Sequence, residues 1–282
     1  MGAKLVTSNS SLARWLRRRA SRFVSTQSPV ILGGSQRSGT TLLRVMLDSH
    51  PALACGPECS LLTGGFLPEK LAKRFDIPLD SIWQMRQAAT DHAHFIELFL
   101  TDYADRRGKR RWAEKTPQNI RHLDWIFAHW PNAKFIHVLR DGRDTVCSIR
   151  THPRFRMIEG EKIPTGIRRP LEPCIQHWLR DTGAGLRWRG KPNYCEVRYE
   201  DLVNQPETTL RQVCAFIGED FVPAMLRYHE QPRDATNFIT NVAATKPLKA
   251  TAIGRWRTEL TTTEQQLFQT LAGARLAELG YN

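Results

Sequence analysis

The chain has 282 residues, of which 41% are hydrophobic, and its 41 Lys and Arg residues outnumber its 28 Asp and Glu residues, giving a formal net charge of +13. Apolar residues recur along the whole length, which excludes intrinsic disorder as the main state, and no apolar run approaches the ~20 residues of a membrane-spanning helix. Six scattered cysteines exclude a disulfide scaffold, and the N-terminus lacks the apolar stretch of a secretory signal. The basic excess predicts an anionic partner or substrate, such as nucleic acid, anionic lipid, an acidic peptide or a phosphorylated cofactor.

Residues 1–28 differ from the rest of the chain because they carry six basic residues and no acidic one. The first acidic residue of the sequence is Asp48. This composition predicts a basic N-terminal extension that is solvated and partly helical. A membrane-surface helix and an organellar transit segment fit the same composition. We take residues 29–282 as the folded domain.

Short apolar runs alternate with helical patterns through this domain. The first run, 29–34, ends in a Gly-rich turn and precedes a helical pattern at 42–47. The further predicted strands are 111–114, 134–139 and 193–199. The further predicted helices are 69–107 (with mixed signals), 119–130, 143 onward, 171–189, 206–218 and 261–279. Loops are predicted at 51–68 and 153–170, and residues 232–254 have no clear period.

The last predicted helix has the clearest start, because Thr261 and Glu264 have the spacing of a capping box. Alternation of strands and helices is typical of a parallel sheet that is covered on both faces. The predicted fold class is therefore α/β, with a P-loop-like central parallel sheet flanked by helices in a single domain.

The sharpest local pattern is the Gly-rich turn 34–41 between the first strand and the first helix. Gly34 and Gly39 fit the G-x-x-x-x-G spacing of a P-loop, in which backbone N–H groups and a helix N-terminus surround a phosphate. Thr40, however, stands where the motif has the Lys that contacts the β- and γ-phosphates. This substitution argues against ATP or GTP hydrolysis and predicts a nucleotide whose phosphates end earlier, near Arg37. The alternative is an ordinary Gly-rich turn that binds nothing.

A second candidate anion site follows the strand at 134–139. Arg140 stands at the carboxyl end of this strand, and Ser148 lies eight residues later on the next predicted helix, so both could bind one phosphate. The same segment could equally be a surface turn with internal salt bridges. Asp141 follows an apolar strand as the acid of a Walker-B element does, so a degenerate P-loop kinase also stays open.

Together these two elements resemble those of the sulfotransferases that use 3′-phosphoadenosine 5′-phosphosulfate (PAPS). In that family the second element binds the 3′-phosphate, and Arg140 and Ser148 match it at the family's spacing. PAPS has no γ-phosphate, which agrees with Thr40, and the resemblance implies no metal ion. The family's first loop binds the 5′-phosphate, and the resemblance assigns this role to Arg37, Ser38, Gly39, Thr40, Thr41 and Leu42.

Within this family, residues 37–51 look most like the cofactor loop of the tyrosylprotein sulfotransferases. Cys55-Gly56-Pro57-Glu58 is similar to the segment that carries their catalytic Glu, and Glu114-Lys115-Thr116-Pro117 is similar to the segment with their catalytic Lys. The resemblance therefore implies Glu58 as the base that accepts the hydroxyl proton. It implies Lys115, together with Arg37, as the groups that stabilise the bridging and leaving oxygens.

The resemblance becomes thinner after residue 200. Tyr199 matches a Tyr that lies by the cofactor, and Lys246 and Arg255 match the C-terminal cofactor loop. On the same register, Thr240 falls where the family has a Ser near the transferring sulfate. Tyr199, Lys246 and Arg255 are thus predicted to bind the cofactor, and Thr240 to add a catalytic hydrogen bond.

The chain also departs from the family. A second Arg, twelve residues after the first, is replaced by His152, and Arg150 is the alternative for that contact. Cys55 and Ala113 stand where the Golgi members have a disulfide, so that bond cannot form. The Golgi membrane anchor is absent as well. These departures predict a cytoplasmic, bacterial-type relative, with peripheral membrane contact or organellar targeting through the basic extension left open.

Each catalytic role has a simpler alternative. Glu58 in a loop could be a solvated acid, and Lys115 before Thr-Pro could be an exposed Lys. Cys55 and Cys59 are spaced like metal ligands, but no second ligand pair accompanies them, so no metal site is predicted. The family's small-molecule branch uses a His as the base, and the candidates for that role are His50, His122 and His137.

We therefore predict a sulfotransferase that moves a sulfuryl group from PAPS to a hydroxyl group. The favoured acceptor is a tyrosine in an acidic protein or peptide, which a net charge of +13 would attract. A small-molecule, lipid or carbohydrate hydroxyl is the first alternative. Whichever acceptor is used, its pocket is expected to be formed by the loops 59–90 and 153–170. A degenerate P-loop kinase and a non-enzymatic binder of nucleic acid or membrane surfaces are the others, with nucleic acid disfavoured. A homodimer stays open.

Overall fold

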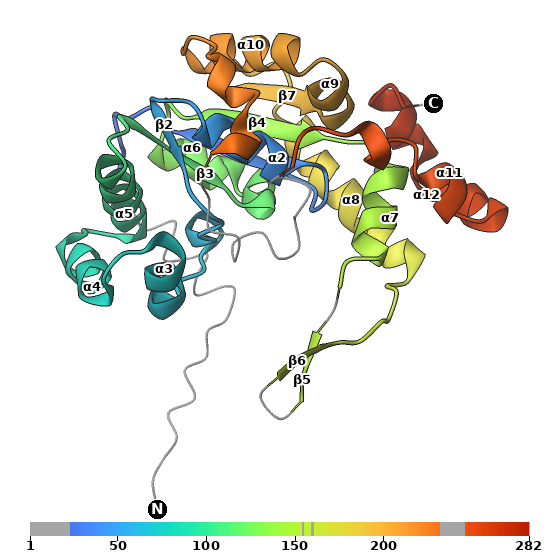
Figure 1. The fold of residues 1–282 in the computed structure, drawn as a ribbon, viewed down its shortest axis with the longest axis horizontal. Helices are drawn as coiled ribbons and strands as arrows, with labels where there is room; N and C mark the ends of the chain where they lie inside the picture. Colours follow the sequence, from blue (N-terminus) through green and yellow to red (C-terminus); the bar gives the residue numbers. More distant parts are fainter. Residues whose placement is uncertain (1–22, 154, 159–160, 232–245, 282) are drawn as a thin grey trace, which may run out of the picture.

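The computed structural model describes residues 23–153, 155–158, 161–231 and 246–281 (Figure 1). Its centre is a five-stranded sheet in the order β2-β3-β1-β4-β7, and every strand pair in it is parallel. The predicted α/β class with a central parallel sheet is confirmed. The strands are β1 (Val30–Gly34), β2 (Leu53–Cys55), β3 (Arg111–Lys115), β4 (Lys134–Leu139) and β7 (Tyr194–Arg198).

Helices surround this sheet (Figure 1). The α-helices are α2 (Thr40–Asp48), α3 (Pro68–Phe75), α4 (Leu79–Ala88), α5 (His92–Arg106), α6 (Leu123–His129), α7 (Gly142–Arg150), α8 (Leu171–Leu186), α9 (Tyr199–Asn204), α10 (Pro206–Ile217), α11 (Trp256–Glu259) and α12 (Thr262–Glu278). Short 3-10 helices are η1 (Leu61–Thr63), η2 (Pro117–Arg121), η3 (Pro223–Met225), η4 (Tyr228–Glu230) and η7 (Ala250–Ala252).

The central strands are buried on both faces, as expected for a parallel sheet between helices. Ile31 and Phe135 belong to one apolar core, which includes the large aromatic side chains of Trp112 and Trp130. The next residues along the strands face the opposite core, in which Leu32 packs with residues of α2 and α10. Side chains that alternate between two cores fix the register of the sheet, and thereby the positions of the loops at its carboxyl edge.

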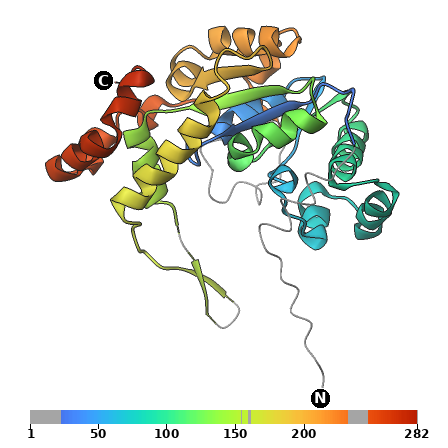
Figure 2. The same cartoon turned by 180° about the vertical axis from the view of Figure 1, so that it is seen from behind.

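A third apolar cluster joins α7, α8 and α12 beyond β4, with Trp178 and Phe268 buried in it. Figure 2 shows α8 and α12 from behind, on the same end of the molecule. The predicted capping box starts α12: Thr261 Oγ1 accepts the N–H of Glu264 at 3.3 Å, and Glu264 Oε2 accepts the N–H of Thr261 at 3.0 Å. This cluster anchors α7, the helix that carries Ser148.

Three predictions about elements were incomplete. The predicted loop 51–68 contains β2 and η1, because a strand of three residues is too short to show an alternating pattern. The predicted loop 153–170 contains an antiparallel hairpin of β5 (Phe155–Ile158) and β6 (Glu161–Pro164), whose sequence is rich in charged residues that strands disfavour. Helix α9 follows β7 directly and was not predicted.

The described end of the basic extension packs on the domain. The N–H of Phe23 donates to Asp91 Oδ2 at 2.9 Å, and the N–H of Ser25 donates to the carbonyl of His129 at 2.7 Å. Residues 1–22, with the predicted helical tail, lie outside the described residues, so the boundary at residue 28 stays a prediction. In the part of the chain that the structure describes, no helix has both the length and the apolar character needed to cross a membrane.

Candidate active site

The candidate site lies at the carboxyl edge of the central sheet, where residues that follow parallel strands meet. The register places Leu32 of β1 beside Lys115 of β3, and Gly34 beside Val138 of β4. Every strand delivers one part of the site at this edge. In the spatial order of the strands, these parts are Glu58 after β2, Lys115 at the end of β3, the loop 34–39 after β1, Arg140 after β4 and Tyr199 after β7.

The loop after β1 has the backbone conformation that its glycines allow. Gly34 and Gly39 have φ angles of 149° and 99°, and Arg37 adopts φ 70°, which is uncommon for a residue with a side chain. A Cβ atom at Gly34 would lie 2.5 Å from the carbonyl oxygen of Val138, and one at Gly39 would overlap the ring of Tyr199. Both glycines are therefore required by close packing as well as by conformation.

Helix α2 begins directly after this loop and presents its N-terminus to the site. Its N-cap residue is Gly39, which has no side chain with which to cap the first-turn N–H groups. Such N–H groups, together with the helix dipole, favour a bound anion. The predicted phosphate loop therefore has the geometry of an anion site, with Thr40 and Thr41 in the first turn of the helix.

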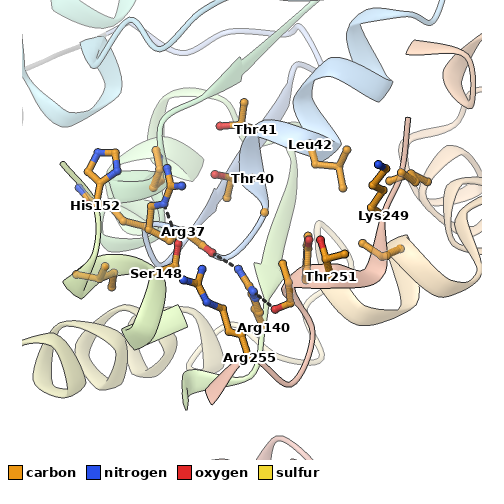
Figure 3. Close-up of a pocket in the computed structure, with 18 of the residues that line it drawn as sticks. Arg37, Thr40, Thr41, Leu42, Arg140, Ser148, His152, Lys249, Thr251 and Arg255 are labelled. Carbon is orange, nitrogen blue, oxygen red and sulfur yellow. Dashed lines mark hydrogen bonds between the residues drawn. The ribbon is translucent and has the colours of Figure 1, made fainter. Parts of the chain in front are cut away.

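The second predicted element contacts the first. Arg140 donates through Nη1 to the carbonyl of Arg37 at 3.0 Å and through Nη2 to the carbonyl of Ala252 (Figure 3). Its guanidinium group lies over the ring of Tyr199, 4.5 Å from the centroid. Ser148 Oγ accepts a hydrogen bond from Arg37 Nε at 3.2 Å. Two segments that are more than a hundred residues apart thus form one site.

These elements line a cavity of about 480 Å³. One predicted cofactor residue and one predicted catalytic residue do not line it: Ser38 is 1% exposed, and Lys115 is 2% exposed behind Glu58. Thr240, another predicted catalytic residue, lies outside the described residues. The cavity brings together the other predicted residues, which are Arg37, Gly39, Thr40, Thr41, Leu42, Glu58, Arg140, Ser148, Tyr199, Lys246 and Arg255.

Glu58 and Lys115 form an ion pair at one end of this cavity. Lys115 Nζ donates to Glu58 Oε1 and also to Thr41 Oγ1, the latter at 3.1 Å. The side chain of Lys115 is 3% exposed, whereas that of Glu58 is 39% exposed, so the carboxylate faces the cavity and the ammonium group lies beneath it. Arg74 of α3 donates to the backbone carbonyl of Glu58 at 2.7 Å and holds the loop in place.

The two partners shift each other's ionisation. Burial raises the pKa of Glu58, but the charge and hydrogen bond of Lys115, helped by Arg74 and Arg44, outweigh it, and the pKa lies below its ordinary value. Burial lowers the pKa of Lys115, and the attraction of Glu58 opposes this shift only in part. At neutral pH Glu58 is therefore a carboxylate, and it can accept a proton from a group in the cavity.

Glu114, which precedes Lys115, fastens the loop that carries Glu58. Its Oε1 accepts hydrogen bonds from the thiol of Cys59 at 3.2 Å and the hydroxyl of Thr116 at 2.6 Å, and Asn119 Nδ2 donates to its other oxygen. Burial raises its pKa although these bonds oppose the shift. No role was predicted for Glu114 from the sequence; the available signal was an acidic residue at the end of a predicted strand.

The C-terminal side of the cavity is a segment that includes Lys246, Lys249, Thr251 and Arg255 (Figure 3). The hydroxyl of Tyr228 donates to the carbonyl of Lys246 at 2.6 Å. Arg255 forms a two-fold ion pair with Glu259, at 2.6 and 3.0 Å. The predicted residues Lys246 and Arg255 therefore lie in the site, and Lys249 and Thr251 were missed because the segment shows no periodic pattern.

Of the two candidates for the second 3′-phosphate contact near Ser148, His152 lines the cavity and Arg150 does not, so the contact itself stays a prediction. Arg150 forms an ion pair with Glu264 at 2.8 Å. Burial and the charges of Arg37 and Arg169 lower the pKa of His152, so its ring is neutral at neutral pH. Arg169 lines the cavity too, and its buried Nε has no hydrogen-bond partner among the described residues. Arg169 was not predicted from the sequence.

The alternative bases lie elsewhere. None of His50, His122 and His137 is among the described residues that line the cavity. His137 is buried inside the sheet, where its Nδ1 is 2.6 Å from the hydroxyl of Tyr194, and burial lowers its pKa to about 3. Within the described ranges, no group of three or more His, Cys, Asp and Glu side chains is arranged to hold a metal ion.

Asp141, the candidate Walker-B acid, caps its own helix. Its Oδ1 accepts the N–H of Arg143 at 2.8 Å, and its Oδ2 accepts Nη2 of Arg143 at 2.8 Å. Cys55 and Ala113 are register partners on β2 and β3, so the two positions at which Golgi members have a disulfide are adjacent here. All six cysteines are free.

The residues of the cavity fit a phosphorylated nucleotide. Nε of Arg140, which lines the cavity, is a buried donor without a hydrogen-bond partner among the described residues, and so is the hydroxyl of Ser38, which belongs to the Gly-rich loop but does not line the cavity. Burial lowers the pKa of Arg37, and the charges of Arg140 and Arg255 lower it further. An anion would relieve this repulsion between like charges. A helix N-terminus, clustered Arg side chains and a neighbouring carboxylate–ammonium pair define a nucleotide-dependent group-transfer site on an α/β sheet.

Comparison with known proteins supplies the family. The family model described as "Sulfotransferase family" matches residues 29–223, so the chain belongs to the sulfotransferase family, as its motifs predicted. Protein-tyrosine sulfotransferase A of Caenorhabditis elegans is 27% identical over 238 residues, which are 80% of this chain and 60% of the relative. This chain thus spans less than two thirds of that relative.

Solved structures agree on the fold. The sulfotransferase domain from the Synechococcus PCC 7002 olefin synthase superimposes with a TM-score of 0.65 at 24% identity, covering 89% of this chain and 97% of that domain. Mouse sulfotransferase SULT7A1, solved in complex with PAP, superimposes with a TM-score of 0.56 at 13% identity, covering 95% of this chain and 89% of that protein. The P-loop-like architecture predicted from the sequence is shared with both.

Proposed function

We propose that this chain transfers the sulfuryl group of PAPS to a hydroxyl group of an acceptor. The observation that carries the proposal is the ion pair of Glu58 and Lys115 beside Thr41, in the first turn of α2. A base, a cation and the N-terminus of a helix thus lie at one end of the cavity. Sulfuryl transfer resembles phosphoryl transfer in needing a deprotonated nucleophile and positive groups that stabilise the moving group and the leaving phosphate.

The nucleotide would lie along the cavity from α2 to α7. The 5′-phosphate fits the N-terminus of α2, with Thr40, Thr41 and Arg37 around it. The 3′-phosphate fits the part of the cavity where Ser148 and Arg169 lie, on the other side of Arg37, whose Nε bonds Ser148 Oγ. Support comes from the buried donors described above and from mouse SULT7A1, which shares the fold and was solved with PAP.

In the proposed reaction, the acceptor hydroxyl gives its proton to Glu58 while its oxygen bonds to sulfur. The bond between sulfur and the bridging phosphate oxygen breaks, so the products are a sulfate ester and 3′,5′-adenosine bisphosphate. Protonation of Glu58 removes the negative charge that attracts Lys115. The ammonium group of Lys115 can then stabilise the leaving phosphate. One proton transfer thus both activates the acceptor hydroxyl and frees Lys115 from its ion pair.

The acceptor that we propose is a tyrosine of an acidic protein segment. A carboxylate whose pKa lies below its ordinary value is a weak base, so it suits the phenol of tyrosine, the most acidic hydroxyl of the protein side chains. The net charge of +13 would attract an acidic segment, and the Caenorhabditis elegans relative is named as a protein-tyrosine sulfotransferase. The kinase alternative loses support because Asp141 is bonded to Arg143 and Thr40 replaces the P-loop Lys.

Two experiments test the proposal. Calorimetry should show tight binding of 3′,5′-adenosine bisphosphate that ATP with Mg²⁺ does not match; a preference for ATP would refute the nucleotide assignment. A transfer assay should then move labelled sulfate from PAPS to an acidic Tyr peptide, with the same peptide carrying Phe as the control. Transfer to a simple phenol or sugar hydroxyl, with none to the peptide, would overturn the tyrosine assignment and retain the reaction.

A further inference from the structure

The segment 246–256, called here the C-terminal wall, lacks internal structure that could hold it against the cavity. Among the described residues its regular structure is limited to η7, a helix of three residues, and the first residue of α11. Yet Lys246, Lys249, Thr251 and Arg255 all line the cavity. Contacts with the rest of the fold must therefore fix its position.

Asp144 on α7 makes the most direct of these contacts. Its Oδ2 accepts the backbone N–H of Gly254 at 2.7 Å, and its Oδ1 accepts the backbone N–H of Trp256 at 3.0 Å. The side chain is buried, with 1% of the residue exposed. Both carboxylate oxygens are thus used by the two residues that flank Arg255 in the sequence.

The neighbours of Asp144 reinforce this attachment. Arg140, one helical turn earlier in the sequence, donates to the carbonyl of Ala252. The guanidinium group of Arg143 lies over the indole of Trp256, 4.0 Å from the ring centroid. The wall is therefore held at residues 252, 254 and 256, every second residue, by one short segment at the start of α7. This segment is the one in which the sequence analysis assigned a role to Arg140 and none to Asp144.

Burying a carboxylate at this place costs free energy unless hydrogen bonds or charges compensate for the lost hydration. Burial raises the pKa of Asp144, and the two backbone hydrogen bonds and the charge of Arg140 oppose that shift only in part. A negative charge close to a phosphate site would also repel the ligand. Two parallel N–H donors nevertheless require two acceptor oxygens, which a carboxylate supplies and an amide does not.

We propose that Asp144 is a positioning residue of the nucleotide site, which holds the C-terminal wall at the distance from the Gly-rich loop that a bound adenosine bisphosphate requires. Arg140 completes the arrangement, because it bonds the carbonyl of Arg37 on the loop and the carbonyl of Ala252 on the wall. The inference rests on the proposed function for the identity of the ligand. The attachment of the wall itself can be tested without any nucleotide.

The test replaces Asp144 by Asn, which has nearly the same shape but turns an N–H₂ group toward a backbone N–H. The matched control is Asp181→Asn, because Asp181 is equally buried but bonds Arg121 and His177 away from the cavity. The rate of trypsin cleavage reports on how firmly the C-terminal wall is held, because trypsin can cleave after Lys249 and Arg255. We expect faster cleavage at these two sites in Asp144→Asn than in the wild type or in Asp181→Asn.

Calorimetry with 3′,5′-adenosine bisphosphate gives the second readout. Loss of a hydrogen bond to a charged group corresponds to weaker binding on the order of ten- to a hundredfold. In the transfer assay, KM for PAPS should rise while KM for the acceptor stays as in the wild type. Asp144→Glu, which retains the charge, should recover part of the affinity, and it replaces Asp144→Asn if that variant does not fold.

Two outcomes would overturn the proposal: trypsin cleavage at Lys249 and Arg255 that matches the Asp181→Asn control, or unchanged affinity for the bisphosphate in a variant whose wall is cleaved faster. The proposed function is tested by a different result, the binding of the bisphosphate to the wild type. If the wild type does not bind the bisphosphate, the nucleotide assignment fails, whereas the cleavage pattern still reports on the attachment of the wall by Asp144.

Discussion

Replacement of Lys115 by Met should move the acid limb of the pH–rate profile to higher pH. In the wild type, Lys115 holds the pKa of Glu58 below its ordinary value, against the effect of burial. Met has a similar length without the charge, so burial then acts unopposed by the nearest cation, and the pKa of Glu58 rises although Arg74 and Arg44 still lower it. Because the base must be ionised, activity is present above this pKa and is lost as the pH falls through it.

The size of the shift follows from the ion pair. At an effective dielectric constant near 20, two unit charges about 4 Å apart interact by about 4 kcal/mol. The Glu58 side chain is 39% exposed, so water screens the pair, and we take about one third to two thirds of that value. About 1.4 to 2.7 kcal/mol corresponds to a shift of about one to two pH units. Loss of the donor should also lower kcat by about 10²- to 10³-fold.

The assay is kcat/KM for sulfate transfer from PAPS, measured from acid to alkaline pH. The control is Lys109→Met, which removes another partly buried Lys that pairs with Asp48 and donates to the carbonyl of Leu53 outside the cavity. Its acid limb should stay where the wild type has it. An acid limb that does not move in Lys115→Met, or that moves to lower pH, would refute Glu58 as a base whose pKa Lys115 controls.

Three further predictions follow from the same contacts. Arg169→Ala should weaken binding of 3′,5′-adenosine bisphosphate about 10- to 100-fold and leave binding of adenosine 5′-monophosphate nearly unchanged. The control is Arg168→Ala, which changes the exposed neighbour, and equal losses of affinity for both nucleotides would contradict a 3′-phosphate contact. Gly39→Ala should abolish measurable nucleotide binding in calorimetry, because its Cβ would overlap the ring of Tyr199, and wild-type affinity would show that the loop adapts. Thr261→Ala should lower the free energy of unfolding by about 1 kcal/mol in urea titration without changing nucleotide affinity, since it removes only the cap of α12.

The parts of the site that the sequence predicted are those encoded in short contiguous segments. The Gly-rich loop shows its conformation in the spacing of Gly34 and Gly39, and Arg140 follows a strand whose bounds were predicted correctly. Glu58 is different. The sequence around Glu58 alone indicates a solvated acid. Its place beside Lys115 depends on the pairing of β3 with β2, and β2 is a strand of three residues that the pattern did not reveal.

The parts that the sequence did not predict depend on contacts between distant segments. Asp144 and Gly254 are 110 residues apart, and nothing in the local pattern of either one indicates the other. Arg169 reaches the cavity because the segment before α8 lies along the end of α7, where its N–H donates to the carbonyl of Arg150 at 3.2 Å. Such pairings follow from tertiary packing, which neither composition nor periodicity records.

The order in which the strands deliver the site has an evolutionary consequence. Glu58 and Lys115 lie on the β2–β3 side of the edge, whereas Arg140 and Tyr199 lie on the β4–β7 side, with the Gly-rich loop between them. The segment 59–110, which connects β2 to β3 and contains α3, α4 and α5, therefore adjoins the chemical half of the site and leaves the nucleotide half to other loops. On the proposed function, recombination or insertion confined to this segment would alter the acceptor side of the site and leave the donor side unchanged, so that a lineage could change the acceptor that it modifies while it keeps the same donor nucleotide.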